Sequence, residues 1–244
     1  MSARFAALVL ATALLPAPAL AGWFVDFETG VAWQGYNDVR IPGDTGTLFS
    51  LTDDLTPGSA PIYRVRLGWN ITDRHTVFAF FAPLRLDATG VAPVDIQFAG
   101  GTYPAGTPVY GTYRFDSYRL TYRYGLVRDE RVDVDIGLTA KVRDAAISLY
   151  GSEFHSRADT GLVPLLSFRV AWRFAGDLGL LLDGDALAGG PGRAEDVLLA
   201  LTWRLRDDLT LKAGYRMVEG GSDVDSVYTF AWIHFAVVGL TVGL

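Results

Sequence analysis

The first feature of the sequence that could do chemistry is the run Gly-Ser-Glu-Phe-His-Ser at residues 151–156. Serine, histidine and a carboxylate are the groups of a hydrolytic triad, so His155 is the strongest single candidate for a catalytic base. The histidines available in the whole chain are His75, His155 and His234. A solvated polar loop explains residues 151–156 equally well, because closeness in sequence does not ensure hydrogen-bonding geometry.

A second chemical feature is a series of charged residues that recur at every second position along several segments. The series contains both acidic and basic residues, so opposite charges on neighbouring segments can form ion pairs. For example, the acids at 26–28 would pair with the arginines at 64–66. Paired charges would plug the space between the segments, whereas unpaired ones would line a selective pore. Both interpretations stay open. The charged residues are Asp26, Glu28, Arg64, Arg66, Arg119, Arg123, Asp133, Asp135, Lys141, Arg143, Arg169, Arg173, Asp183, Asp185, Arg204, Lys212 and Arg216.

The elements that must position these charges are predicted by the same periodicity. Apolar and polar side chains alternate in segments 23–34, 63–71, 117–124, 132–143, 166–173 and 197–205. Because a β-strand has a side-chain period of two, each segment has one apolar and one polar face. In a soluble β-sandwich the apolar faces would point into the core, and the many arginines and aspartates of the polar faces could not easily be accommodated. We therefore expect a closed sheet in lipid, with the charges facing a lumen, because closure satisfies every backbone group.

The connections between these segments alternate between short and long. Four short turns and five long loops join about ten strands into an all-β, antiparallel, up-and-down transmembrane β-barrel. Short turns face the periplasm in such barrels, which places both termini there. Eight or twelve strands are alternatives, because the first two loops can hide or extend a hairpin. We expect short turns at 72–74, 128–131, 175–177 and 206–208, and long loops at 37–61, 89–108, 151–161, 189–193 and 219–225.

Aromatic residues on the apolar faces give an independent indication of a membrane. Four of them precede short turns, which predicts one ring at the periplasmic interface, and the others are expected to form the opposite ring. The first set is Trp69, Tyr124, Trp172 and Trp203, and the second is Trp33, Tyr63 and Tyr215. The loop segment 97–108, rich in glycine and proline, suits either an ordered hairpin over the barrel mouth or a flexible loop.

The N-terminus and the composition agree with export. Residues 1–21 contain a basic start, an apolar run and an Ala-x-Ala site, the layout of a secretory signal peptide, so we expect a mature barrel domain at 22–244. The chain has no cysteine, and its formal charge of −6 gives no support to nucleic-acid binding. No motif for a cofactor or a metal site is present.

The last residues, Val-Gly-Leu-Thr-Val-Gly-Leu at 238–244, resemble the C-terminal insertion signal of Gram-negative outer-membrane β-barrel proteins. Gly239, Val242 and Leu244 fit the pattern, in which phenylalanine is the usual final residue. The resemblance implies an outer-membrane location, recognition of the last strand by the barrel-insertion machinery, and contact with outer-membrane lipid and lipopolysaccharide. We expect a monomer.

Two enzyme resemblances are weaker. Ten-stranded proteases that resemble the omptins need acidic pairs and an Asp–His pair near the outer rim, and this chain has no Asp-x-His. Lipid A deacylases and outer-membrane phospholipases carry their histidine and serine on strands with fixed spacing, whereas Ser152, His155 and Ser156 are crowded into one segment. The sequence therefore favours a narrow porin-like channel for small polar or charged solutes. A closed barrel with a structural or surface-interaction role and a hydrolase centred on His155 are the alternatives.

Overall fold

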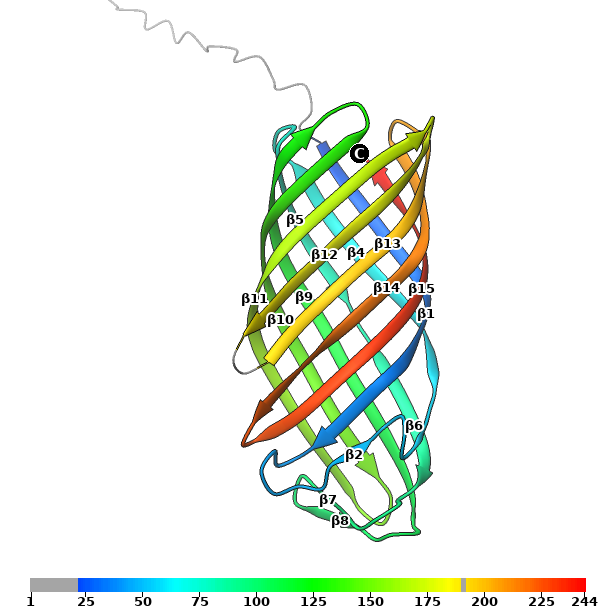
Figure 1. The fold of residues 1–244 in the computed structure, drawn as a ribbon, viewed down its shortest axis with the longest axis vertical. Helices are drawn as coiled ribbons and strands as arrows, with labels where there is room; N and C mark the ends of the chain where they lie inside the picture. The colour runs from blue at the N-terminus through cyan, green and yellow to red at the C-terminus, as the bar shows by residue number, and fades with distance from the viewer. Residues whose placement is uncertain (1–21, 190–191) are drawn as a thin grey trace, which may run out of the picture.

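The chain forms a tall, closed barrel of antiparallel strands, as the computed structural model shows for residues 22–189 and 192–244 (Figure 1). The predicted signal peptide at residues 1–21 lies outside these described residues. The described part of the chain contains no helix of the length and apolar character needed to cross a membrane.

Ten strand positions make up the wall, which confirms the predicted fold class. Consecutive wall strands are neighbours, and β1 pairs with both β4 and β15, so the sheet closes on itself. The wall strands are β1 (Gly22–Arg40), β4 (Ser59–Asn70), β5 (His75–Ala82) with β6 (Arg85–Val91), β9 (Pro108–Arg128), β10 (Val132–Tyr150), β11 (Phe154–Ala175), β12 (Leu178–Gly189), β13 (Gly192–Arg206), β14 (Leu209–Val224) and β15 (Val227–Gly243).

The third wall position is divided between β5 and β6, and both pair with β9. The division falls at Pro83 and Leu84. Proline has no backbone N–H and cannot extend the ladder, so the strand breaks there and resumes two residues later.

The short turns lie beside the two termini, at the top of Figure 1, as predicted. At the opposite end two expectations are wrong. The loop predicted at 151–161 shrinks to 151–153, and the loop predicted at 219–225 shrinks to 225–226, because β10, β11, β14 and β15 continue as paired strands. These extensions lie beyond the lipid, at the end of the barrel opposite the termini. Water can hydrogen-bond to their outward side chains there, so the outward residues need not be apolar.

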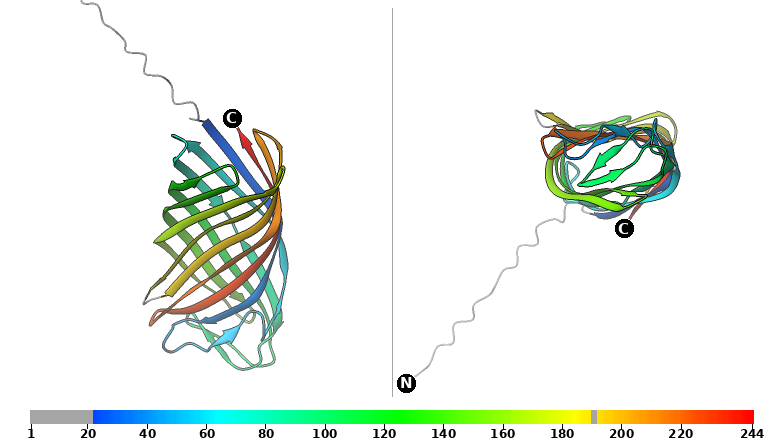
Figure 2. Two further views of the ribbon diagram at one scale, coloured as in Figure 1. Left: turned by 45° about the horizontal axis from the view of Figure 1, so that its top comes forward. Right: turned by 90° about the horizontal axis from the view of Figure 1, so that it is seen from below.

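The two longest connections fold over the opening at this far end, and we call segments 41–58 and 92–107 the cap. The cap contains β2 (Phe49–Ser50), β3 (Thr56–Pro57) and the hairpin of β7 (Ile96–Phe98) and β8 (Gly101–Tyr103). Seen from below, this hairpin lies across the barrel mouth (Figure 2). Ala99 and Gly100 have φ of 50° and 90°, which suits a tight two-residue hairpin turn. The segment 97–108 is therefore an ordered hairpin, one of the two predicted alternatives.

The outer surface of the barrel carries an apolar belt. On β13, Leu199, Leu201 and Trp203 are between 50% and 60% exposed, and the next outward residues toward the cap are Val197 and then Glu195. The apolar outward residues of β13 run from Val197 to Leu205, which are eight residues apart. In a strand tilted by about 40°, this separation corresponds to a height of about 20 Å, close to the roughly 25 Å apolar band of outer-membrane barrels. An apolar belt of this height is stable only against lipid.

Candidate functional site

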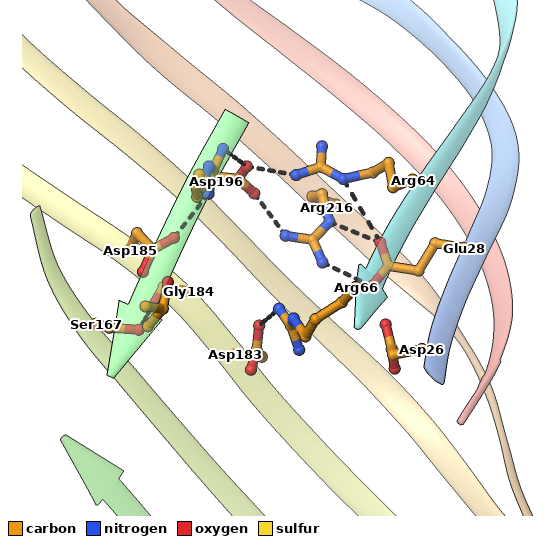
Figure 3. Close-up of polar contacts among 12 residues, drawn as sticks. Asp26, Glu28, Arg64, Arg66, Ser167, Asp183, Gly184, Asp185, Asp196 and Arg216 are labelled. Atoms are coloured by element: carbon orange, nitrogen blue, oxygen red, sulfur yellow. Dashed lines mark hydrogen bonds and ion pairs between the residues drawn. The ribbon is translucent and has the colours of Figure 1, made fainter. Parts of the chain in front are cut away.

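Asp196 of β13 is the centre of a layer of buried ion pairs inside the barrel (Figure 3). Its carboxylate, 1% exposed, accepts hydrogen bonds of 2.5 Å from the guanidinium groups of Arg64, Arg119 and Arg216. Those arginines come from β4, β9 and β14, so one carboxylate ties together strands from opposite sides of the ring. Without these cations, a carboxylate so deeply buried would be too costly to hold ionised.

Glu28 of β1 is a second centre in the same layer. Arg216 donates to both of its oxygens, with Nη2–Oε1 at 2.8 Å and Nε–Oε2 at 3.1 Å, and Lys212 Nζ lies 2.7 Å from Oε1. Lys212 also bonds Asp26 at 2.8 Å, and Thr241 donates to the same carboxylate at 2.6 Å. The layer is therefore a connected network, which holds each side chain more firmly than isolated pairs would.

β12 supplies the remaining acids of the layer. Asp183 accepts from Arg123 at 2.6 Å and from Arg66 at 2.9 Å, and Asp185 accepts from Arg119 at 2.7 Å. The sequence suggested that the arginines at 64–66 pair with the acids at 26–28 on the neighbouring strand. Arg64 does pair with Glu28, with Nε–Oε2 at 3.8 Å. The register also places Arg66 opposite Asp26, but the hydrogen bond of Arg66 crosses the lumen to β12 instead. Asp183 and Asp185 are buried in this layer, whereas omptin-like proteases need acidic pairs near the outer rim.

Two phenylalanines of β5 fill the spaces between the arginines. Phe78 and Phe80 are buried and face inward, and guanidinium groups lie over both rings, which adds cation–π attraction to the ion pairs. The distances from guanidinium carbon to ring centre are 4.5 Å for Arg66 and 5.0 Å for Arg123 over Phe78, and 5.0 Å for both Arg64 and Arg119 over Phe80.

The other charges predicted to line the lumen also lie on inward positions, but outside this layer. Asp135 accepts hydrogen bonds from Arg128 and, at 2.9 Å, from Arg169. Arg143 bonds Asp159 on β11. Four more remain: Lys141, which is buried, and the partly exposed Asp133, Arg173 and Arg204, the last bonded to Asp177 in a turn at 3.1 Å.

The sequence interpretation missed Asp196, one of the two centres of the layer. Asp196 lies on the same face of β13 as Leu198, Ala200 and Arg204, so extending the alternation by one step would have found it. Phe78 and Phe80 were missed for a different reason. β5 reads as a continuous apolar run with no polar face, so its inward residues carry no signal in the alternation.

The half of the lumen nearest the cap is filled by apolar side chains instead of ion pairs. Cap residues Phe49, Phe98 and Tyr103 are buried to 2% exposure or less, and they pack against inward residues such as Leu149. The Tyr103 hydroxyl donates to the carbonyl of Leu149 at 2.9 Å, and burial raises the pKa of Tyr103. This packing resembles the core of a soluble domain and holds the cap onto the barrel.

Beside this apolar core lies a cavity of about 410 Å³. Its walls come from β9 to β15, and they are mostly apolar. The cations on its lining are Lys141, Arg143 and Arg193, and the carboxylate of Glu219, also on the lining, is paired with Arg193. This volume falls in the range of about 300–1,000 Å³ typical of small-molecule sites.

The candidate triad around His155 assembles only in part. His155 Nε2 lies 3.0 Å from Glu153 Oε2, in the rim beside the cap. Neither serine joins them, since Ser152 Oγ bonds the carbonyl of Thr102 at 3.4 Å and Ser156 Oγ bonds Ser148 Oγ at 2.9 Å. The geometry therefore offers an acid–base pair without an adjacent nucleophile.

The other two histidines lie on the outer surface among aromatic side chains. His75 Nδ1 is 2.8 Å from the Tyr122 hydroxyl, and His234 Nδ1 is 2.6 Å from the Tyr215 hydroxyl, with its ring stacked on Trp33 at 5.5 Å. Within residues 22–189 and 192–244, no three His, Cys, Asp or Glu side chains are arranged to hold a metal ion.

The seven aromatics predicted at the membrane interfaces all point outward. Trp69 stacks on Trp23 at 5.9 Å near the termini, and Tyr63 packs edge-on against Phe81 further toward the cap. The exposed fractions are Trp33 39%, Tyr63 50%, Trp69 40%, Tyr124 37%, Trp172 49%, Trp203 53% and Tyr215 41%.

No protein-family model and no curated protein sequence matches the chain. Solved structures do match its fold. The outer membrane protease OmpT from Escherichia coli superimposes with a TM-score of 0.56 at 10% identity, covering 96% of this chain and 99% of that one. The attachment invasion locus protein Ail of Yersinia pestis has a TM-score of 0.41 at 12% identity, covering 91% and 99%. The transport unit of the autotransporter AIDA-I from Escherichia coli has a TM-score of 0.43 at 7% identity, covering 97% and 93%.

Identities this low carry the fold and nothing of the chemistry. The closed antiparallel wall, the outward apolar belt and the OmpT-like architecture agree with one another. The chain has the fold of a Gram-negative outer-membrane β-barrel.

Proposed function

We propose that the chain is a closed outer-membrane barrel that presents a folded extracellular end to a surface partner. The observation that carries this proposal is the double filling of the lumen. Ion pairs centred on Asp196 and Glu28 occupy one part, and the apolar core beneath the cap occupies another. Separating buried ion pairs leaves uncompensated charges, at about 3–5 kcal/mol for each broken pair, so spontaneous opening is disfavoured.

The surface role is supported by apolar side chains at the cap end that lie beyond the lipid-facing belt. Leu48, Val91 and Val94 are exposed by 54%, 53% and 51%. Apolar residues exposed beyond the lipid are candidates for contact with another macromolecule. Because the cap is packed onto the barrel, such a surface would be rigid and would lose little entropy on binding.

The narrow porin-like channel predicted from the charged rows is the second candidate function. The observation that favours it is the cavity of about 410 Å³, which already occupies part of the lumen. To become a passage, the cavity would have to continue through the layer around Asp196.

Single-channel recording in a planar bilayer tests the two candidates. The folded chain from residue 22 onward is expected to be silent, and Asp196→Asn is expected to give rare, noisy openings because three arginines lose their shared acid. Stable, ion-selective openings of the wild-type barrel would overturn the closed-barrel proposal and establish the porin-like one. Folding is verified first by the compact, heat-sensitive band on a gel.

A further inference from the structure

The cavity beneath the cap has an opening in the barrel wall between β11 and β12. Pairing of these two strands ends at Leu166 and Ala186, yet β11 continues to Phe154 with a partner only on its β10 side. Pro164 lies two residues beyond the last pair, and it has no backbone N–H to donate to a further strand. β11 therefore separates from β12 at this point.

Side chains on both sides of the wall line the cavity at this gap. Leu162 and Pro164 belong to the outward face of β11, and Leu162 is 71% exposed. Leu187 points inward from β12 and is nevertheless 40% exposed, because the wall beside it is open. Beyond Leu162 the outward face of β11 becomes more polar, with Thr160 and Ser156 on it. The gap thus lies at the cap-side edge of the lipid belt, the level of the outer leaflet.

The inner end of the cavity contains a cation without a partner. Lys141 is 3% exposed, and its Nζ lies 4.6 Å from the centre of the Phe115 ring, which also lines the cavity. Among the described residues, no carboxylate lies within ion-pair distance of Lys141 and no hydrogen bond to its ammonium is made. The Nε of Arg143, two residues along the same strand, is likewise buried without a partner.

The charges around Lys141 cannot supply the missing anion. Asp185 and Asp196, the acids of the adjoining layer, already accept hydrogen bonds from arginines. The cations of that layer, Arg64, Arg66, Arg119, Arg123, Lys212 and Arg216, outnumber its acids, Asp26, Glu28, Asp183, Asp185 and Asp196. A buried ammonium without a counter-charge is strongly unfavourable, so the site as built favours an incoming anion.

We propose that this cavity binds an anionic amphiphile, a single alkyl chain that ends in a carboxylate or phosphate. The acidic head bonds Lys141 Nζ, with Arg143 Nε as a further donor, and the chain lies along the apolar walls formed by residues such as Tyr113, Val163 and Val218. The ligand enters through the gap at Pro164 from the outer leaflet and never needs to cross the ion-pair layer. The site therefore works equally well in a barrel that conducts no ions.

Binding of dodecanoate tests the proposal in nanodiscs of zwitterionic phosphatidylcholine. Carboxyl-labelled [1-¹³C]dodecanoate is expected to give a saturable protein-bound signal with one site per barrel. Lys141→Met is expected to weaken binding at least tenfold, since a hydrogen bond to a charged group contributes about 1.5–3 kcal/mol. Lys141→Arg should restore most of the affinity, and Arg85→Gln at the exposed rim is the matched control and should change nothing.

Competition experiments separate the head from the chain. Dodecyl phosphate should displace dodecanoate, whereas dodecanol, dodecyltrimethylammonium and the short acid butanoate should not. Ala145→Phe, which retains both cations and fills the cavity from β10, should abolish binding and keeps the proposal testable if Lys141→Met does not fold. Lipid A, which carries several acyl chains, should leave dodecanoate bound, and its displacement of dodecanoate would contradict a site for a single alkyl chain.

Equal binding by wild type, Lys141→Met and Ala145→Phe would overturn the proposal, as would equal competition by the neutral and cationic chains. These outcomes are independent of the conductance recordings. A conducting barrel that binds dodecanoate through Lys141 would refute only the closed-barrel function, and a silent barrel that does not bind it would refute only the site.

Discussion

Arg216 of β14 reaches past β15 to hold Glu28 of β1 with two hydrogen bonds, of 2.8 Å and 3.1 Å. Both side chains are 2% exposed, so neither charge can be satisfied by water once the other is removed. Glu28→Gln is expected to lower the free energy of unfolding by about 3–5 kcal/mol, the usual effect of leaving one partner of a buried pair uncompensated. Urea unfolding of the barrel in lipid vesicles measures this change.

The matched control for Glu28→Gln is Asp208→Asn in a turn near the termini. Asp208 pairs with Arg206, and their side chains are 52% and 65% exposed. An exposed pair of this kind contributes less than about 1 kcal/mol. If the two variants unfold at the same urea concentration, the interior ion pairs are hydrated and the closed-barrel proposal loses its main support.

Tyr103 is expected to anchor the cap without holding the barrel together. It is fully buried, and its hydroxyl bonds the carbonyl of Leu149. Tyr103→Ala removes a core aromatic, which typically destabilises packing by about 3–5 kcal/mol, and the cap should detach before the wall opens. Proteinase K should then cut within 92–107 while the heat-sensitive gel band stays. Thr102→Ala, on the opposite face of the same strand, should remain resistant, and cleavage of both variants alike would contradict the anchoring role.

Asp129 gives a pH-dependent turn on the side of the termini. Its carboxylate accepts backbone N–H bonds from Arg131 at 2.7 Å and Val132 at 3.2 Å, and these bonds lower its pKa. A pKa lower in the folded than in the unfolded chain means that the carboxylate stabilises the turn above the unfolded value of about 3.9 and loses that effect as pH falls through the folded value. The protection factor of the Arg131 amide, its exchange rate compared with that of an unstructured peptide at the same pH, should therefore fall on acidification.

Asp129→Ala should show a low protection factor at Arg131 at every pH, and it should equal the wild type only in acid. Glu130→Gln leaves both hydrogen bonds in place and is expected to reproduce the wild-type profile. A carboxyl-¹³C titration of Asp129 with a midpoint at or above 3.9, the usual aspartate value, would refute this account of the turn.

The wall of the barrel is predictable from the sequence because lipid imposes a strict alternation. Residues such as Leu199 and Leu201 must face outward, which fixes the phase of the strand and puts Ala200 inside. Above the membrane this constraint ends. Ser156 and Thr160 on β11 face water, so their polar character made residues 151–161 look like a loop although the strand continues.

The ion pairs of the interior are less predictable, because which side chains meet depends on how the sheet closes into a ring. Alternation identifies Arg66 as an inward residue, but only the curvature of the ring brings it to Asp183, 117 positions along the chain. The sequence also does not show that Lys141 lacks an ion-pair partner, because its position in the alternation is the same as that of any other inward charge. What distinguishes it is that no carboxylate of the described residues lies within ion-pair distance of it, because the acids of the adjoining layer are paired with arginines.

Depth-dependent fluorescence quenching tests the interface rings predicted from aromatic positions. Trp203 and Leu199 both face outward on β13, and four residues of tilted strand separate them, about 10 Å along the membrane normal. In a variant that keeps only Trp203, lipids brominated near the headgroup should quench more than lipids brominated at mid-chain. A variant with Leu199→Trp as its only tryptophan should show the opposite order, because that site lies deeper in the belt. If both sites respond identically, the belt is not aligned with the bilayer as the aromatic rings indicate.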